Sequence, residues 1–116
     1  MTFNVENGRL NAILNQRSQD MLAANNWNVV QYSALVMMFA QVSNLQPGEF
    51  IHVIADAHIY DRHIEIVKEL VTRPAFPAPA FRVDPDIKNF YDFTIDSFEV
   101  DHYQHGEKIG PFPVAE

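Results

Sequence analysis

The chain contains no cysteine in its 116 residues. That absence excludes disulfide bonds, zinc sites built on thiolates and any cysteine nucleophile within these residues. Basic residues are also few, because eight Lys and Arg stand against fifteen Asp and Glu and give a formal net charge of −7. A chain with that balance lacks the basic surface that polymeric nucleic acids require, so we expect no nucleic-acid partner.

Long apolar runs are absent as well. The longest, from Ala34 to Ala40, is too short to span a bilayer, and the first residues show neither a signal nor a transit pattern. We therefore expect a soluble, cytoplasmic protein with no membrane partner. What is present is 47% hydrophobic residues in a non-repetitive order, which is typical of a globular chain. Its length indicates one domain at most, or a piece of one.

The first half of the chain predicts two strands and a helix. Residues 2–5 and 9–16 are expected to be strands joined at Glu6-Asn7-Gly8, since Asn-Gly tolerates the positive φ of a hairpin turn. Residues 20–24 predict a short helix or turn. The stretch 29–43 predicts a helix that is apolar around most of its circumference and should be buried on several sides. So short a chain can hardly cover it, which indicates that covering elements are absent.

The second half predicts a strand over 49–60, whose even-numbered residues share one face. An amphipathic helix is expected over 61–72, where apolar residues recur at helical spacing. The remainder is expected to be extended or irregular, with two short strands at 81–83 and 93–100. The sum is an α+β fold in which a sheet is covered by one deeply buried helix.

Polar residues with complementary chemistry border these apolar elements at three places. They are Gln16-Arg17-Ser18-Gln19-Asp20, then Asn28, then Asp56-Ala57-His58-Ile59-Tyr60. A phosphate monoester needs a fork of N–H donors and a short hydroxyl donor, which Arg17 and Ser18 supply from adjacent positions. The alternative for that pair is an ordinary exposed Arg-Ser.

The other two places suit a nucleoside. Asn28 has a donor and an acceptor on one planar group, and uracil presents a ring N–H beside a carbonyl; a carboxylate would suit cytosine instead. Its alternative role is to cap the helix that follows. His58 and Tyr60 lie two apart on the predicted strand, so they point the same way and both can bind one sugar hydroxyl. The alternative is a half-buried polar pair at a sheet edge. Asp56, on the same face, could orient His58 or simply end the strand.

A metal site is the competing interpretation. The candidate ligands are Asp56, His58, Asp61, His63, His102 and His105. Residues of a strand and of the helix after it need not converge on one ion, and no His-Glu-x-x-His pattern occurs. We therefore expect no metal.

In order and spacing, these motifs resemble the C-terminal part of thymidylate synthase. The resemblance runs through Gln-Arg-Ser-x-Asp, Trp-Asn-Val-Val-Gln-Tyr, Pro-Gly-Glu-Phe and Asp-Ala-His-Ile-Tyr, from about Asn4 to Ala115. It implies a truncated thymidylate-synthase-like sheet with a deeply buried helix, in which residues 1–116 form the nucleotide-binding half of the domain. It also implies a homodimer in which sheets pair. The family transfers and reduces a one-carbon unit from 5,10-methylenetetrahydrofolate onto dUMP, giving dTMP and dihydrofolate.

The resemblance also implies residue roles. The dUMP-binding residues would be Arg17, Ser18, Gln19, Asp20, Asn28, His58, Ile59 and Tyr60. Asp20 would lie between nucleotide and folate, and Ala115 would close over the folate. Asn28 favours the dUMP reaction over the similar dCMP hydroxymethylases, which have Asp there. The chain departs from the family at Trp27, a Phe in most members, at Ala55 in place of Gly, and at its terminal Glu116.

A larger departure is the missing nucleophile. The family's Pro-Cys segment lies immediately upstream of the strand with which this chain begins. The acid/base glutamate, the folate-stacking tryptophans and the arginines lent across the dimer lie upstream too. Without a thiol, C6 of uracil cannot be activated for one-carbon capture. We therefore expect these residues alone to be inactive, with only an auxiliary catalytic role for Asp20. The alternative is a non-catalytic nucleotide-binding or dimerising remnant of the same fold.

Overall fold

The computed structural model describes residues 1–113, and its main sheet has the strand order β1-β2-β3. The strands are β1 (Thr2–Glu6), β2 (Arg9–Asp20) and β3 (Gln46–His58). β1 is antiparallel to β2, and β2 is parallel to β3. The hairpin between β1 and β2 turns through Asn7 at φ 49° and Gly8 at φ 75°, which confirms the prediction from Asn-Gly.

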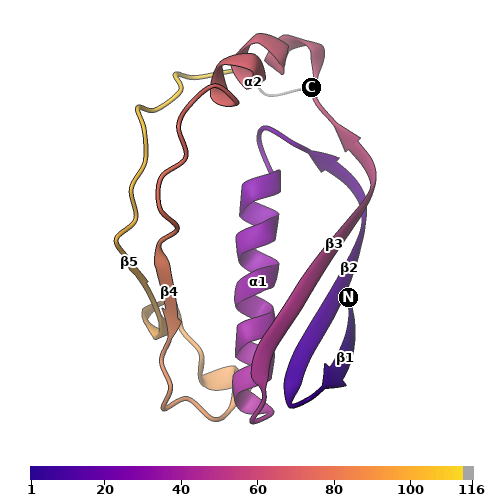
Figure 1. The fold of residues 1–116 in the computed structure, drawn as a ribbon, viewed down its shortest axis with the longest axis vertical. Coiled ribbons are helices and arrows are strands. Elements are labelled where there is room, and N and C mark those ends of the chain that lie inside the picture. Colours follow the sequence, from indigo (N-terminus) through magenta and orange to yellow (C-terminus); the bar gives the residue numbers. More distant parts are fainter. Residues whose placement is uncertain (114–116) are drawn as a thin grey trace.

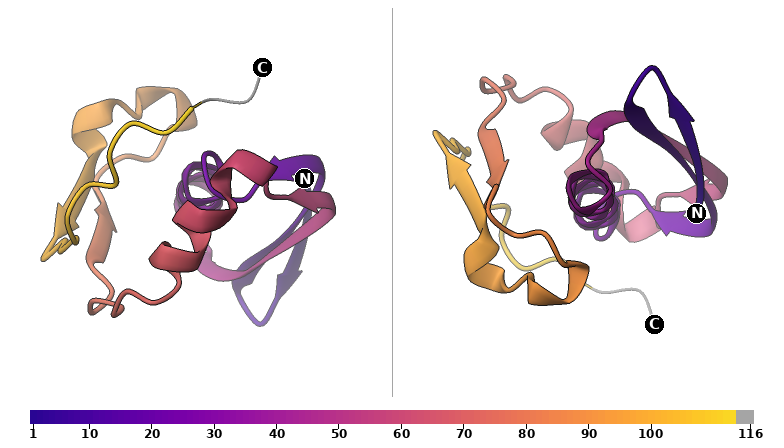
Figure 2. Two further views of the ribbon diagram at one scale, coloured as in Figure 1. Left: turned by 90° about the horizontal axis from the view of Figure 1, so that it is seen from above. Right: turned by 90° about the horizontal axis from the view of Figure 1, so that it is seen from below.

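Parallel strands need a crossover connection, and α1 (Asn25–Val42) provides it between β2 and β3. Figure 1 shows α1 between the main sheet on one side and the segments that carry β4 and β5 on the other, and Figure 2 shows the same arrangement from above and below. Val36 and Ala40 of α1 are buried, whereas Trp27 and Val30 are exposed. A groove of about 630 Å³ runs between this helix and β4–β5. The helix is therefore central, yet the described residues cover it only in part.

Two strands are longer than the sequence indicates. β2 continues four residues beyond the expected end at Gln16, to Asp20. β3 begins at Gln46, so Pro47 and Gly48 lie in the strand and not in a loop. The register between the two strands shifts between Leu10 and Ala12, and a side chain on Gly48 would collide there with the Asn11 amide. Glycine at this position allows the close approach between the strands.

The segment after β3 is less regular than predicted. A 3-10 turn (Asp61–His63) leads into α2 (Ile64–Leu70). The predicted strand over 93–100 is wrong in its first half. Two 3-10 turns, at Phe90–Asp92 and Ile95–Ser97, precede the short β5 (Phe98–Asp101), which pairs with β4 (Ala80–Val83). Reciprocal hydrogen bonds between Thr94 and Ser97 form a capping box that favours the turn over an extended strand.

The described residues 1–113 include no helix that is both long and apolar enough to cross a membrane.

Candidate functional site

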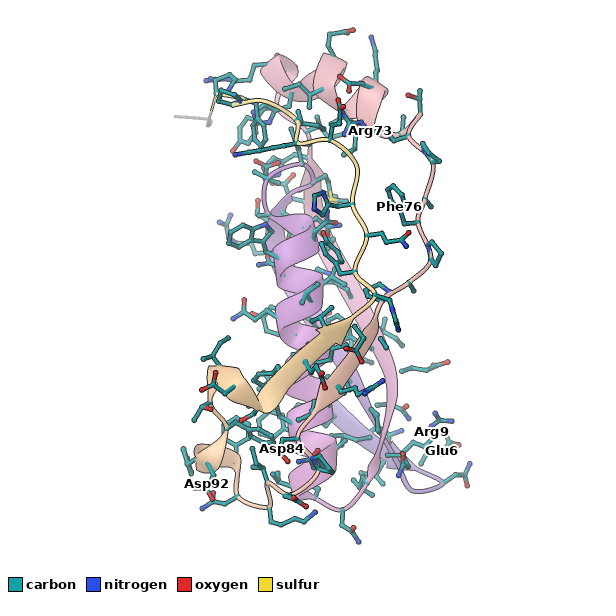
Figure 3. All side chains as sticks on the ribbon, turned by 90° about the vertical axis from the view of Figure 1, so that its left-hand side faces the viewer. Glu6, Arg9, Arg73, Phe76, Asp84 and Asp92 are labelled. Carbon is teal, nitrogen blue, oxygen red and sulfur yellow. The ribbon has the colours of Figure 1, made fainter. Side chains whose placement is uncertain are left out.

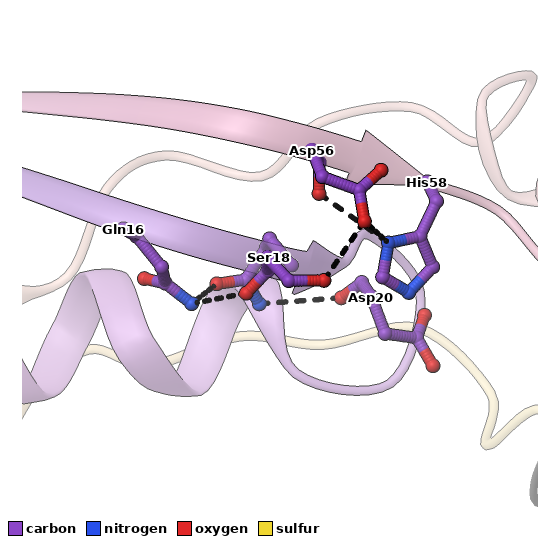
Figure 4. A network of polar contacts seen from close by, with 6 residues as sticks. Gln16, Ser18, Asp20, Asp56 and His58 are labelled. Carbon is purple, nitrogen blue, oxygen red and sulfur yellow. Dashed lines mark hydrogen bonds and ion pairs between the residues drawn. The ribbon is translucent and has the colours of Figure 1, made fainter.

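The polar residues singled out from the sequence gather where the parallel strands β2 and β3 end. Ser18 lies opposite Asp56, and Asp20 lies opposite His58. The chain then turns from β2 into α1, which brings Asn28 in the first turns of that helix to the same place. Figure 4 shows the network from close by. Carboxyl ends of parallel strands are the usual place for ligands in open sheets, because the loops that follow the strands converge there.

Gln16 is the central residue of this network. Its Nε2 has two N–H bonds and lies within hydrogen-bond distance of three acceptors that share them: the Ser18 carbonyl at 3.0 Å, the Asn28 Oδ1 at 2.9 Å and the Gln19 side-chain oxygen. Its Oε1 lies 2.8 Å from the His52 Nε2. Gln19 is only 2% exposed, so the carboxamide of Gln16 satisfies a buried polar group on one side and orients Asn28 on the other.

The orientation of Asn28 follows from these contacts. The Ser18 carbonyl can only accept, so the nitrogen of Gln16 faces it, and Asn28 must therefore present its oxygen to that nitrogen. The described residues leave the Asn28 Nδ2 without a hydrogen bond, and its oxygen keeps a second lone pair. Asn28 does not cap the helix, because α1 begins at Asn25 with Ala24 in the N-cap position. The capping alternative is wrong.

A second chain of contacts joins the two strand ends. The Ser18 hydroxyl donates to the Asp56 carboxylate at 3.0 Å. The His58 Nδ1 lies 3.4 Å from the same carboxylate oxygen and 3.3 Å from the Asp56 carbonyl. The ring of Tyr60 meets His58 edge to face at a centroid distance of 5.1 Å. Asp56 thus fixes the ring of His58, as expected, and Tyr60 stands beside it.

The remaining site residues differ in how far they are engaged. The Asp20 Oδ1 accepts from the backbone N–H groups of Leu22 and Ala23, so this carboxylate shapes the turn into α1. Arg17 is exposed, and among the described residues its guanidinium has no hydrogen bond or ion pair. Ile59 follows His58 and is exposed. Ala115 lies outside the described residues, so its expected place over the folate stays a prediction.

Sequence reasoning did not single out Gln16 as an orienting residue or His52 as its partner, and it considered His63 only as a possible metal ligand. A signal for Gln16 existed, since it continues the face of Leu10, Ala12 and Leu14, where a core residue would be expected. Its partner Asn28 is twelve residues away, however, and could not be assigned from the strand alone. Within residues 1–113, no three His, Asp or Glu side chains gather around a position that could hold a metal ion.

Comparisons with known proteins identify relatives of this chain. The family model for thymidylate synthase matches residues 1–115. The thymidylate synthase of Bacillus atrophaeus is 44% identical over 105 residues, covering 90% of this chain and 46% of that protein. That of Bacillus licheniformis is 46% identical over 111 residues, covering 96% and 39%. The bifunctional dihydrofolate reductase-thymidylate synthase of Plasmodium chabaudi is 45% identical over 107 residues, covering 92% and 18%.

A solved structure is similar too. The thermostable thymidylate synthase A from Bacillus subtilis superposes with a TM-score of 0.92 at 41% identity, over 96% of this chain and 40% of that one. The chain therefore spans less than half the length of the relatives it matches. The family model matches nearly all residues of this chain, and the relatives are similar in both sequence and structure, so the chain belongs to the thymidylate synthase family.

Proposed function

We propose that residues 1–116 are the nucleotide-binding half of a thymidylate synthase domain and that their site binds dUMP. The observation that carries this proposal is the side-chain amide of Asn28, which Gln16 holds through its oxygen so that the NH2 group and one oxygen lone pair are left over. Uracil offers a carbonyl and a ring N–H that match those two groups. Arg17, exposed and without a partner in the described residues, would bind the phosphate.

In the complete reaction, 5,10-methylenetetrahydrofolate would be the cosubstrate and dTMP the product. Asp20 would lie between the two substrates, and Ala115 would close over the folate. These residues supply no thiol, so we propose that they are inactive on their own. We also propose that the protein acts in the cytoplasm. A non-catalytic nucleotide-binding or dimerising remnant remains the alternative. Formation of dTMP by the purified chain, free of any complete enzyme, would contradict the inactivity.

Titration calorimetry tests the binding. We expect saturable binding of dUMP, weaker binding of deoxyuridine because it lacks the phosphate, and weaker binding of dCMP because its ring nitrogen has no proton. Arg17→Gln should weaken dUMP about tenfold or more and leave deoxyuridine unchanged, since a charge-assisted hydrogen bond typically contributes about 1.5–3 kcal/mol. Arg9→Gln is the matched control, because Arg9 lies at the opposite end of β2 (Figure 3). No binding of dUMP at millimolar concentration would favour a structural remnant.

We propose further that the chain forms a homodimer through the outer face of the main sheet. Ile13 on β2 and Ile51 on β3 are neighbours in register, and Val53 lies two residues further. These side chains are 41%, 47% and 47% exposed, so they make a contiguous apolar surface on the face away from α1.

Light scattering tests the dimer. Ile51→Lys should give a monomer, because two copies would bury like charges against each other. Ile95→Lys is the control, because Ile95 is an exposed apolar residue away from this sheet and should leave the dimer intact. A wild-type chain that stays monomeric at high concentration would contradict the proposal.

A further inference from the structure

His63 is the most completely buried polar side chain among the described residues, at 0% exposure. It lies at the end of the 3-10 turn between β3 and α2. Neither the metal interpretation nor the dUMP-binding residues account for it. A histidine at full burial requires an explanation, because an apolar residue of similar size would fill the space without carrying two polar nitrogens.

The hydrogen bond made by one ring nitrogen of His63 explains why a histidine is buried at this position. The His63 Nε2 lies 2.7 Å from the carbonyl of Pro113, fifty residues further along the chain. A carbonyl only accepts, so Nε2 carries the proton and donates. The Nδ1 is buried with no hydrogen-bond partner in the described residues, which fits a neutral ring with its one proton on Nε2.

The ring of His63 also connects the nucleotide site to the C-terminal segment. It meets the ring of Tyr60 at 5.8 Å and that of Phe112 at 5.3 Å, both edge to face. Tyr60 in turn meets His58. A continuous set of ring contacts therefore runs from the proposed sugar-binding residues to the residue before Pro113.

A second contact holds the same segment further up the chain. The Arg73 guanidinium donates to the Glu107 carbonyl at 2.7 Å and pairs with Glu69 at 2.6 Å, on an exposed surface (Figure 3). Exposed ion pairs contribute little, because water competes with them. The buried contact at His63 is thus the stronger constraint on the end of the segment.

We propose that His63 is a positioning residue that fastens Phe112 and Pro113 to the end of β3, so that the chain end and the dUMP site are coupled. This inference rests on the proposed function for its coupling to dUMP, but not for the fastening itself.

The test compares two variants by the rate at which carboxypeptidase removes the last three residues, followed by mass spectrometry. His63→Phe keeps a ring and removes the donor, so we expect release to be roughly three- to tenfold faster, as the loss of one hydrogen bond gives. His63→Gln keeps an N–H donor and should release at a rate near that of the wild type. Arg73→Gln is the matched control at the exposed contact and should change the rate less than His63→Phe.

Addition of dUMP tests the coupling. It should slow release in the wild type. His63→Gln keeps the N–H donor but loses the ring contacts with Tyr60 and Phe112, so its release rate should respond less to dUMP. If dUMP does not bind at all, the proposed function fails, while the rates without ligand still test the fastening.

Equal release from His63→Phe and wild type would overturn the proposal. So would a His63→Gln variant that behaves like His63→Phe, because the contact would then be packing and not a hydrogen bond. Should His63→Phe fail to fold, the long-range ¹H–¹⁵N spectrum of the wild-type imidazole decides. A proton on Nε2 supports the fastening, and a proton on Nδ1 alone overturns it.

Discussion

The inner face of β2 changes character halfway along the strand. Its first half presents Leu10, Ala12 and Leu14, all buried toward α1. Its second half continues the same face with Gln16 and Ser18, which are polar and half-buried. The first half stabilises the fold by removing apolar surface from water. The second half buries less apolar surface and instead makes hydrogen bonds to residues on α1 and β3.

The difference shows that the site is a continuation of the core with different side chains. A carboxamide at a core position costs stability unless each of its groups is bonded, and Gln16 is bonded at both its nitrogen and its oxygen. The satisfied network then holds Asn28 in one orientation. Mutations in the first half should therefore act on stability, and those in the second half increasingly on binding.

The largest effect is expected from Leu14→Ala in the first half. Leu14 is 7% exposed, and truncation of a buried leucine leaves a cavity that costs about 2–5 kcal/mol. Urea unfolding followed by circular dichroism measures the loss. Ile95→Ala is the control and should change stability by less than about 0.5 kcal/mol, because Ile95 is highly exposed. Equal losses in both variants would remove the distinction between core and surface.

A smaller loss is expected from Gln16→Leu, the first polar position of the face. Leucine fits the apolar pattern, yet it leaves the side-chain oxygen of the buried Gln19 without its donor, which costs about 1–3 kcal/mol. Because Asn28 also loses its orienting bond, dUMP affinity should fall by about tenfold. Denaturant unfolding and calorimetry measure the two effects. Gln31→Leu, at an exposed position of α1, should show neither. A more stable Gln16→Leu would mean that the network opposes folding.

The first half of β2 could be predicted from sequence, because alternation and an Asn-Gly turn are local signals. The motifs read from the sequence lie together in the structure because the carboxyl ends of the parallel strands β2 and β3 meet, a pairing that the sequence did not predict. The length of β2 could not be predicted, because Ser18 and Asp20 are held by pairing with Asp56 and His58, a contact across 38 residues. His63 gave no local signal for the same reason, as its partner lies fifty residues away.

The prediction of a strand over residues 93–100 was wrong in its first half for another reason. Their alternation of apolar residues fits a strand imperfectly, and a local hydrogen bond between Thr94 and Ser97 outweighs it. Such side-chain bonds to the backbone compete with a strand even where the apolar pattern is favourable.

Asn28→Asp sharpens the comparison by changing chemistry with little change in packing. The carboxylate still accepts from Gln16 but loses the N–H that would donate to uracil, so dUMP should bind about tenfold more weakly. The dCMP amino group gains an acceptor, so preference between the two should move toward dCMP in competition calorimetry. Asn26→Asp is the control, because it adds the same charge in the same part of α1 at an exposed position. An unchanged preference would show that residue 28 does not contact the base.

Ser18→Ala should have the smallest effect on stability, although it lies at the end of the same face. The bond that it removes, to Asp56, is exposed, so water replaces it and the loss should stay below about 1 kcal/mol. When dUMP binds, the Ser18 hydroxyl would turn from Asp56 to the phosphate, so its removal should lower dUMP affinity severalfold while deoxyuridine binding stays constant. Ser43→Ala, an exposed serine at the end of α1, provides the control for both readouts. If Ser18→Ala instead destabilised the chain as strongly as Gln16→Leu, the polar half of β2 would be serving the fold and not the ligand.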